Sequence, residues 1–405
     1  MSAQTSPQPA QNFSPSEKRI LALLAAVQFV NILDFMMVMP LGPDLGKALG
    51  ISIDYLGWIG GSYTFAAFLS GIFGSFYLDK MKRKSALLIH LTGLSLATLA
   101  ATFATDLWTL LIARVLAGLF GGPTTSTQLA ILSDVIPAER RGRALGLVMG
   151  AFSLASILGV PVGLELARLG GWQFPFWIVG ALAGLTVLLC WVFLPKVEHE
   201  RAPGSQDGDS IFKLGTVPIS LFLASCAIFA SFLLIPNLSG FLQFNVGFPR
   251  EQLGILYFTG GILSLFSTRL GGIWNDRVGS ATPLLVSTSI FTFLLITGML
   301  VQKPWLHPIP WFALLMLANS LRWISISTLT SKVPPARWRA RYMSLLSAAQ
   351  HLASSLGAFC STQFLVAGEG GRLEGIPRLA TVSLGVSLLI PPLAIKLQRI
   401  LKKQA

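Results

Sequence analysis

Residues 132–159 read LSDVIPAERRGRALGLVMGAFSLASILG, and 198 positions further on residues 330–357 read TSKVPPARWRARYMSLLSAAQHLASSLG. The two stretches share 13 identical residues in 28 aligned positions. In both, an apolar run ends, a Pro-Ala dipeptide and an Arg-x-Arg turn follow, and a second apolar run begins. Another pattern, Leu-Gly followed by Asp and a basic residue, recurs from residues 56–80 to residues 253–277. The chain therefore contains a tandem duplication, and parallel halves of this kind are typical of a class of transporters.

The composition is that of a membrane protein. Hydrophobic residues form 53% of the 405 residues, charged residues only 12%, and the mean hydropathy is +0.68. A soluble chain would carry about a quarter charged residues. The cysteines Cys190, Cys226 and Cys360 lie inside apolar runs without paired spacing, so we expect neither a disulfide framework nor a metal site. The sequence predicts an all-α protein that crosses a membrane many times.

Apolar runs near the length of about 20 residues that crosses a bilayer recur along the chain and predict about twelve spans. The first six lie at residues 20–41, 56–78, 85–104, 108–135, 144–169 and 174–194, and the second six at 217–242, 253–274, 283–301, 311–331, 342–366 and 380–395. The predicted division is a cytoplasmic tail at 1–18, an N-terminal six-helix bundle at 19–194, a cytoplasmic linker at 195–216, a C-terminal six-helix bundle at 217–397 and a basic cytoplasmic tail at 398–405.

Basic residues are distributed unequally between the two sides of the predicted membrane. Connections on the side of the N-terminus carry 21 Lys and Arg residues, and connections on the opposite side carry six. By the positive-inside rule, both termini and the linker are expected in the cytoplasm, with the protein in the cell membrane, the inner membrane of a bacterium. This topology explains the net charge of +13 without a nucleic-acid partner.

Two loops, after the second and the eighth predicted span, share a motif. Residues 74–84 read GSFYLDKMKRK, and residues 271–279 read GGIWNDRVG. These loops resemble the cytoplasmic loop motif of the major facilitator superfamily, which reads G-x-L-A-D-R-x-G-R-[RK]. The second copy keeps both glycines of the motif, whereas the first has Ser75 and Lys82 in their places.

The resemblance implies a cytoplasmic gate. In the family this loop locks the outward-facing state, because small residues let two helices approach and an acidic group pairs with arginines and helix-start N–H groups. The residues that correspond here, with Asp134 as an expected further member, are Asp79, Arg83, Asp134, Asp276 and Arg277. Ordinary positively charged cytoplasmic loops are the alternative interpretation.

The fifth predicted span contains a second family resemblance. Residues 157–163 read ILGVPVG, and Gly171, Trp172 and Phe174 follow. This segment resembles the fifth-helix antiporter motif of the twelve-span drug:proton antiporters and sugar-efflux-type permeases. That motif is usually written G-P-x-x-G-G, whereas this chain has Gly159, Pro161 and Gly163 as G-V-P-V-G. Small residues with a proline make a bendable helix that packs closely on its neighbour, and a simple packing helix is the alternative.

Two charged residues lie within the predicted hydrocarbon core of the first bundle. Asp34 precedes the outer end of the first span by about seven residues, and Arg114 follows the outer start of the fourth by a similar number, so both lie about 10 Å deep. We predict that Asp34 takes up and releases a proton beside Arg114, because burial and the guanidinium act on its pKa in opposite directions. The family resemblance also implies a proton-coupling role for an arginine at this place. A static buried ion pair is the alternative.

Candidate residues for a central substrate cavity come from several spans. Arg322, with Asn319 and Trp323, lies near the middle of the tenth span without an adjacent acid, which suits an anionic substrate. It could equally pair with Asp34 across the cavity or be structural. We also assign Asn31, Gln128 and His351 to this cavity. Gln128 belongs to a polar stretch at 124–128 whose hydroxyls can instead bond back to the helix, and a lone histidine is commonly a packing residue.

The residues and the resemblance together predict a major facilitator fold, with about twelve helices in two pseudo-symmetric six-helix bundles. The predicted function is a proton-coupled antiporter that exports a small organic molecule by alternating access. A facilitator or proton symporter for a metabolite and a transport-silent membrane sensor are the alternatives. We expect no enzymatic activity and no cofactor, since no nucleophile–base pair or phosphate loop is present in the sequence. The expected partners are the substrate, protons and the lipid bilayer, and the expected state is a monomer.

Overall fold

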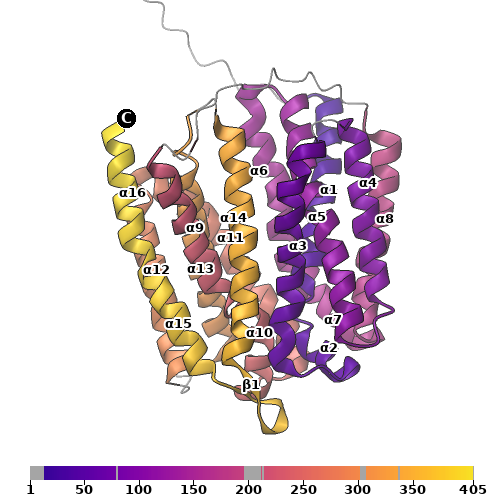
Figure 1. Cartoon of the computed structure of the whole chain (residues 1–405), viewed down its shortest axis with the longest axis vertical. Coiled ribbons are helices and arrows are strands. Elements are labelled where there is room, and N and C mark those ends of the chain that lie inside the picture. The colour runs from indigo at the N-terminus through magenta and orange to yellow at the C-terminus, as the bar shows by residue number, and fades with distance from the viewer. Residues whose placement is uncertain are drawn as a thin grey trace, which may run out of the picture.

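The computed structural model of this chain describes residues 13–78, 81–195, 211, 214–301, 307–335 and 338–404. Long helices dominate it and run roughly along one axis (Figure 1). The residues of the first half form α1 Pro15–Met37, α3 Leu56–Tyr77, α4 Arg83–Ala101, α5 Leu107–Val135, α6 Ala138–Leu154, α7 Val160–Gly170 and α8 Gln173–Phe193. A π-helical segment, η3 Ala155–Gly159, joins α6 to α7, so these two form one continuous span.

The second half repeats this arrangement. Its spans are α9 Thr216–Phe232 with α10 Ile235–Gly240 and η5 Phe241–Asn245, α11 Leu253–Val278, α12 Ala281–Leu295 with η7 Ile296–Leu300, α13 Pro308–Thr330, α14 Arg339–Phe364, and α15 Ile376–Leu388 continued by α16 Ile390–Gln404. Within the described residues, eleven helices are long and apolar enough to cross a membrane. The helix outside this set is α14, which is rich in serine and carries Gln350 and His351, yet it packs along α3 and α9 over the same height (Figure 1). The twelve-helix prediction is thereby confirmed.

Short elements close the connections at one end of the molecule. They are α2 Gly42–Leu49, η1 Ile53–Tyr55, η6 Arg250–Gln252, η9 Glu369–Gly371 and an antiparallel hairpin of β1 Val366–Ala367 with β2 Leu373–Glu374. We call this end the hairpin side and the opposite end, where α1 begins and α16 finishes, the termini side (Figure 1). Residues 398–404, predicted as a tail, continue helix α16. The linker residues 196–210 lie outside the described part of the chain.

Helix starts follow local sequence signals. Ser14 and Glu17 form a capping box at the start of α1, with each side chain accepting from the backbone N–H of the other residue. Asp106 caps α5 by accepting from the backbone N–H of Thr109 at 2.9 Å. This hydrogen bond holds the pKa of the exposed Asp106 carboxyl below its ordinary value.

The two halves meet through two equivalent seams near the hairpin side. In one seam α3 packs on α14, where a Cβ on Gly57 would overlap the carbonyl oxygen of Ala358. In the other, α11 packs on η3 and α7, where a Cβ on Gly261 would come within 3.0 Å of Ile157. Small residues on each seam therefore permit direct backbone approach, which is how helices associate without a hydrophobic driving force.

The hydrophobic core shows where the halves are joined and where they separate. One large cluster on the hairpin side contains buried residues of both halves, among them Val30, Leu56, Leu233 and Leu256. On the termini side the core splits into two clusters, one built from α1, α3, α4, α5, α6 and α8 and one from α9, α12, α13, α14 and α16. The halves are thus joined at the hairpin side and have separate cores at the termini side.

Candidate functional site

A fully buried ion pair lies inside the first bundle. Asp34 on α1 is 0% exposed and Arg114 on α5 is 1% exposed. Arg114 Nη1 donates to Oδ1 and Oδ2 of Asp34 at 3.1 and 3.2 Å, and Nη2 donates to Oδ2 at 3.2 Å. The two residues lie at one level, as their distances from the ends of their spans predicted. A pair of opposite charges with several hydrogen bonds is the arrangement that makes a charged residue tolerable in a bilayer.

Two further side chains complete this ion pair. Thr98 on α4 donates its hydroxyl to Oδ1 of Asp34 at 2.7 Å. The ring of Tyr63 on α3 lies under the guanidinium of Arg114, with 4.8 Å between its centroid and Cζ. Four helices therefore contribute to the site, and in this conformation the carboxylate faces the bundle interior without any surface exposed to solvent.

A polar network adjoins the pair toward the termini side. Tyr63 donates its hydroxyl to Oδ1 of Asn31 at 3.2 Å. The amide of Asn31 in turn donates to the carbonyl of Gly121 at 3.2 Å and to the hydroxyl of Thr125 at 2.8 Å. Asn31 is 6% exposed and its bonds stay within the first bundle, so the structure places it in the bundle interior instead of at an open substrate cavity.

Arg322 occupies a comparable place in the second bundle with different partners. Its Nη2 donates to Ser231 Oγ at 2.6 Å and to Asn319 Oδ1 at 3.0 Å, and its Nη1 donates to Ser387 Oγ at 3.3 Å. Its Cζ lies 4.0 Å from the centre of the Phe291 ring. Among the described residues it has no acidic partner. The predicted alternative of a pair with Asp34 is wrong, because Asp34 is bound by Arg114 within the other bundle.

The residues predicted for the substrate cavity differ in their exposure to solvent. Gln128 is fully buried on α5, and Arg322 is 1% exposed on α13 with Asn319 beside it. His351 is half-buried on α14, whereas Trp323 is 43% exposed. Hydropathy cannot separate these environments, because a polar residue in a span faces a cavity or a satisfied bundle interior with the same sequence signal.

The predicted cytoplasmic gate is formed in part. Arg83 Nε donates to Asp134 Oδ2 at 3.1 Å, which ties the start of α4 to the end of α5. Asp79 lies outside the described residues. Asp276 and Arg277 near the end of α11 are exposed, and within the described part of the chain neither makes an ion pair. Among the described residues, Asp276 and Arg277 thus contribute no ion pair to a gate in this conformation.

The fifth-helix motif packs on α1 of its own half, and the segment that carries it, η3 and α7, also packs on α11 of the other half. A Cβ on Gly159 would come within 2.6 Å of Leu33, and one on Gly163 within 3.2 Å of Met37, so both glycines allow close contact with α1. The π-helical segment η3 ends at Gly159, two residues before Pro161. The structure thus gives this segment the irregular, closely packed geometry that its glycines and proline predicted.

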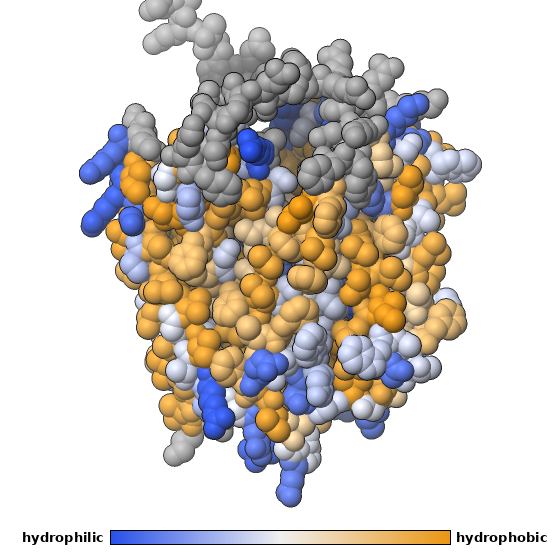
Figure 2. Space-filling view, viewed as in Figure 1, coloured by the Kyte–Doolittle hydropathy of each residue, from blue (hydrophilic) through white to orange (hydrophobic). Residues whose placement is uncertain are grey.

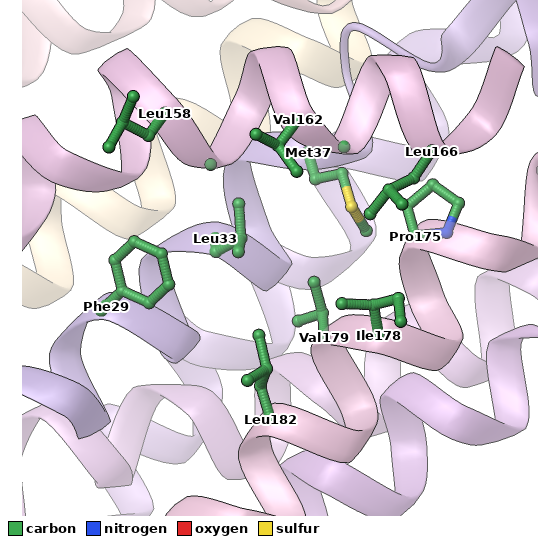
Figure 3. A pocket seen from close by; sticks show the side chains of 12 residues that line it. Phe29, Leu33, Met37, Leu158, Val162, Leu166, Pro175, Ile178, Val179 and Leu182 are labelled. Atoms are coloured by element: carbon green, nitrogen blue, oxygen red, sulfur yellow. The ribbon is translucent and has the colours of Figure 1, made fainter. Parts of the chain in front are cut away.

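A small pocket of about 150 Å³ opens beside this motif, between α1, η3–α7 and α8. Apolar side chains line this pocket, among them Phe29, Leu33 and Met37 of α1, Val162 of α7 and Leu182 of α8 (Figure 3). A drug-sized ligand needs about 300 Å³ or more and some polar groups to orient it. The pocket therefore does not fit a polar substrate in this conformation.

An ion pair links the halves on the hairpin side. Arg250 at the start of η6 donates from Nε to both carboxylate oxygens of Asp44 at 2.9 Å, and from Nη2 to Oδ2 at 2.5 Å. Nearby, Ser239 on α10 donates to the carbonyl of Pro40 at 2.8 Å. These contacts hold residues that are about 200 positions apart in the sequence, and they close the end at which the shared core lies.

The surface agrees with a protein that lies in a bilayer. Hydrophobic residues form a broad band across the middle of the face in Figure 2, and hydrophilic residues gather toward its two ends. Many of the exposed large side chains are apolar and belong to spans, including Leu96, Ile112, Leu185 and Phe266. A continuous apolar band of this kind is expected where lipid, not water, is the solvent.

Several site residues were missed by the sequence reasoning. Thr98, Tyr63, Ser231 and Ser387 are single polar residues within apolar spans and resemble residues that bond back to their own helix. Asp44 and Arg250 could have been suspected, because they are opposite charges in connections on the less charged side. Only packing between distant helices reveals the partners of each residue.

Comparison with known proteins agrees with this geometry. A family model described as Major Facilitator Superfamily matches residues 24–358. The uncharacterized MFS-type transporter YwfA of Bacillus subtilis is 26% identical over 330 residues, 80% of this chain and 80% of that protein. The multidrug resistance protein MdtG of Proteus mirabilis is 26% identical over 296 residues, 68% of this chain and 72% of that protein. A bacterial homolog of the human lysosomal transporter Spinster, in an inward-facing and occupied conformation, has the same fold with a TM-score of 0.76 at 17% identity, covering 96% of this chain and 98% of that one.

Proposed function

Because this chain belongs to the major facilitator superfamily, we propose that it is a proton-coupled antiporter that exports a small organic molecule, with Asp34 as its proton carrier. The protein is a multi-pass membrane transporter, not an enzyme. The single observation that supports proton coupling is the buried pair of Asp34 and Arg114, since a carboxylate at this depth is the group whose charge can be cancelled by a proton.

The proposed cycle uses the two protonation states of Asp34. As a carboxylate it holds Arg114 and Thr98, as in this structure. A proton on the carboxyl would cancel the charge that binds Arg114 and free the guanidinium to change partners. Substrate binding and proton binding would then favour different conformations of the bundle, and such a difference is what couples two ligands in an alternating-access transporter.

The orientation follows from the charge bias. If the termini side is cytoplasmic, the structure is closed toward the outside by the Asp44–Arg250 pair and the shared core. Export then requires this pair to open and the separated ends at the termini side to close. Asp276 and Arg277, which are exposed near the end of α11, are the residues proposed to take part in that closure.

Export as the direction rests on two supports. The relative MdtG is named as a multidrug resistance protein, and the fifth helix carries a glycine–proline segment that resembles the antiporter motif. The substrate is proposed only as a small organic molecule, because the pocket beside the fifth-helix motif is small and apolar and does not indicate a substrate class.

The test uses purified protein in lipid vesicles with an imposed pH gradient and a pH indicator inside. Ethidium, chloramphenicol, a pentose and benzoate serve as probes of cationic, neutral, sugar and organic-acid substrates. Antiport predicts that protons move opposite to one probe, whereas symport moves them in the same direction and a facilitator moves none.

The matched variants are Asp34→Asn and Glu165→Gln, which both convert a carboxylate to an amide. Glu165 is an exposed surface residue paired with Arg168. We expect Asp34→Asn to abolish proton-linked transport and Glu165→Gln to retain it. Full proton-driven transport by Asp34→Asn would refute the proposed role of Asp34.

A further inference from the structure

The seam between α1 and α5 contains buried polar atoms that no described residue satisfies. Gln128 on α5 is fully buried, and neither its Nε2 nor its Oε1 has a hydrogen-bond partner among the described residues. The Oε1 of Gln28 on α1 is likewise buried without a hydrogen-bond partner among the described residues. A buried polar group that stays unpaired destabilises the folded protein. The seam therefore differs from an ordinary apolar contact between helices, which contains no unpaired polar atoms.

Helix geometry places these groups next to the Asn31 network. Asn31 on α1 bonds to Thr125 on α5 at 2.8 Å, Gln28 precedes Asn31 by three residues, and Gln128 follows Thr125 by three. Because α1 and α5 run in opposite directions, both steps lead about 4.5 Å toward the termini side and keep to the same helix faces. Gln28 and Gln128 thus form the next polar layer on the route from the ion pair to that side.

The series begins at the ion pair itself. Arg114 uses its two Nη atoms on Asp34, while its Nε is buried without a partner among the described residues. From Arg114 to Gln128 the helix α5 covers 14 residues, about 21 Å. The unpaired Nε of Arg114 lies at one end of this length. The hydrogen-bonded residues Tyr63, Asn31 and Thr125 follow, and the unpaired side-chain atoms of Gln28 and Gln128 come last.

We propose that this α1–α5 seam binds a chain of water molecules that carries the proton between Asp34 and the termini side. Water fits the seam because it both donates and accepts, and a buried water typically makes about three hydrogen bonds to groups that lack other partners. Gln128 offers an NH2 group with two donor hydrogens and a carbonyl oxygen that accepts, so it is a positioning residue for this chain. The inference rests on the proposed function in taking Asp34 as the proton carrier.

The proton balance of the path is simple. The neutral carboxyl of Asp34 gives its proton to the first water, and each oxygen accepts one proton and passes one on. One proton leaves into solvent, the carboxylate pairs with Arg114 again, and Gln128 stays neutral throughout. The hairpin side is closed by Asp44–Arg250 and the shared core, so in this conformation the seam leads to the end at which the halves are separated.

Water in the seam is tested directly by water-edited solid-state NMR on the full chain with 15N-labelled glutamine in lipid vesicles. The side-chain signals are assigned from the variants Gln28→Met and Gln128→Met. We expect both amides to receive magnetisation from water as fast as exposed glutamines do. If the Gln128 amide receives none, the seam is dry and the proposal fails.

Function of the path is tested by a pH jump in a stopped-flow instrument, with a soluble indicator that follows proton uptake by the purified protein. The Asp34-dependent phase is the difference between the wild type and Asp34→Asn. We expect Gln128→Met to slow this phase about tenfold, because it interrupts a hydrogen-bonded chain. The matched control is Thr288→Val, which removes an unpaired buried oxygen from α12 in the other half, and it should leave the rate unchanged.

The melting temperature of Gln128→Met distinguishes a hydrated seam from a dry one. Different results would contradict the water chain and the proposed role of Asp34. In a dry seam, Gln128→Met removes an unsatisfied amide and raises the melting temperature. A raised melting temperature together with an unchanged proton-uptake rate would overturn the water chain. If Asp34→Asn leaves proton uptake unchanged, the proposed role of Asp34 fails, whereas the NMR experiment still reports whether water occupies the seam.

Discussion

The two halves of this transporter each bury one arginine, and they compensate its charge in different ways. Arg114 is paired with a carboxylate, whereas Arg322 is bound by two hydroxyls, an amide oxygen and the face of a ring. A carboxylate can be neutralised by a proton, but hydroxyl and amide acceptors cannot, and arginine itself does not lose its proton in proteins. Protonation could therefore change the net charge of the buried site in the first bundle, whereas the buried charge of Arg322 in the second bundle is fixed.

The largest loss of stability is expected for Arg114→Gln, which removes the ion pair with Asp34. Removal of one partner leaves Asp34 buried and uncompensated, at a cost of about 3–5 kcal/mol in the free energy of unfolding. Reversible unfolding in mixed micelles measures this value. The double variant Asp34→Asn/Arg114→Gln should recover most of the loss, and an equal loss in both variants would contradict the view that the isolated charge is the cause.

A smaller loss is expected for Thr98→Val, which keeps both charges and removes only the hydroxyl that donates to Asp34. A hydrogen bond to a charged group contributes about 1.5–3 kcal/mol. The control is Ser95→Ala on the same helix, whose hydroxyl donates to the neutral carbonyl of Gly180 at 2.8 Å and should contribute about 1 kcal/mol. Equal losses from the two variants would mean that Asp34 is not charged in the folded state.

The variant Arg322→Gln tests the second bundle, in which the buried arginine is bound by neutral groups. Ser231, Asn319 and Ser387 are neutral, and Ser231 also donates to the carbonyl of Ala227, so no isolated charge stays behind. We expect a loss of about 1–2 kcal/mol, clearly below that of Arg114→Gln. In vesicles, loss of benzoate transport with retained benzamide transport would show that Arg322 also contacts substrate, and unchanged selectivity would leave it a structural link between helices.

The smallest effect concerns the aromatic ring beside Arg322. Phe291→Leu conserves most of the buried apolar volume and removes the ring face, which lies 4.0 Å from the guanidinium carbon. A buried cation–π contact contributes about 1–2 kcal/mol, so this variant should be less stable than Phe241→Leu by about 1 kcal/mol. Phe241 is similarly buried and lies against Trp311, and no cation among the described residues lies over its ring. Equal losses would show that the ring contributes packing alone.

Much of the fold could be predicted from the sequence. The boundaries of most spans agree with the helices within a few residues, because a bilayer requires a run of about 20 apolar residues. The exceptions are α6, which begins at Ala138 before the predicted span at 144–169, and α16, which continues to Gln404 beyond the predicted span at 380–395. The duplication predicted the two equivalent halves, and depth arithmetic placed Asp34 beside Arg114. Close packing of the fifth span was also predicted, since its small glycine residues act locally.

The sequence by itself thus determined the class, the number of spans and the one buried pair whose members share a depth, because each depends on local composition and on rise per residue. Tertiary structure alone decided that Thr98 and Tyr63 complete that pair, that Arg322 lacks an acid, and that Asp44 joins Arg250 across the halves. The reason is physical. In a bilayer the lipid-facing and the packed faces of a helix are equally apolar, so no periodicity shows which faces meet, and contacts between distant helices appear only when the chain is folded.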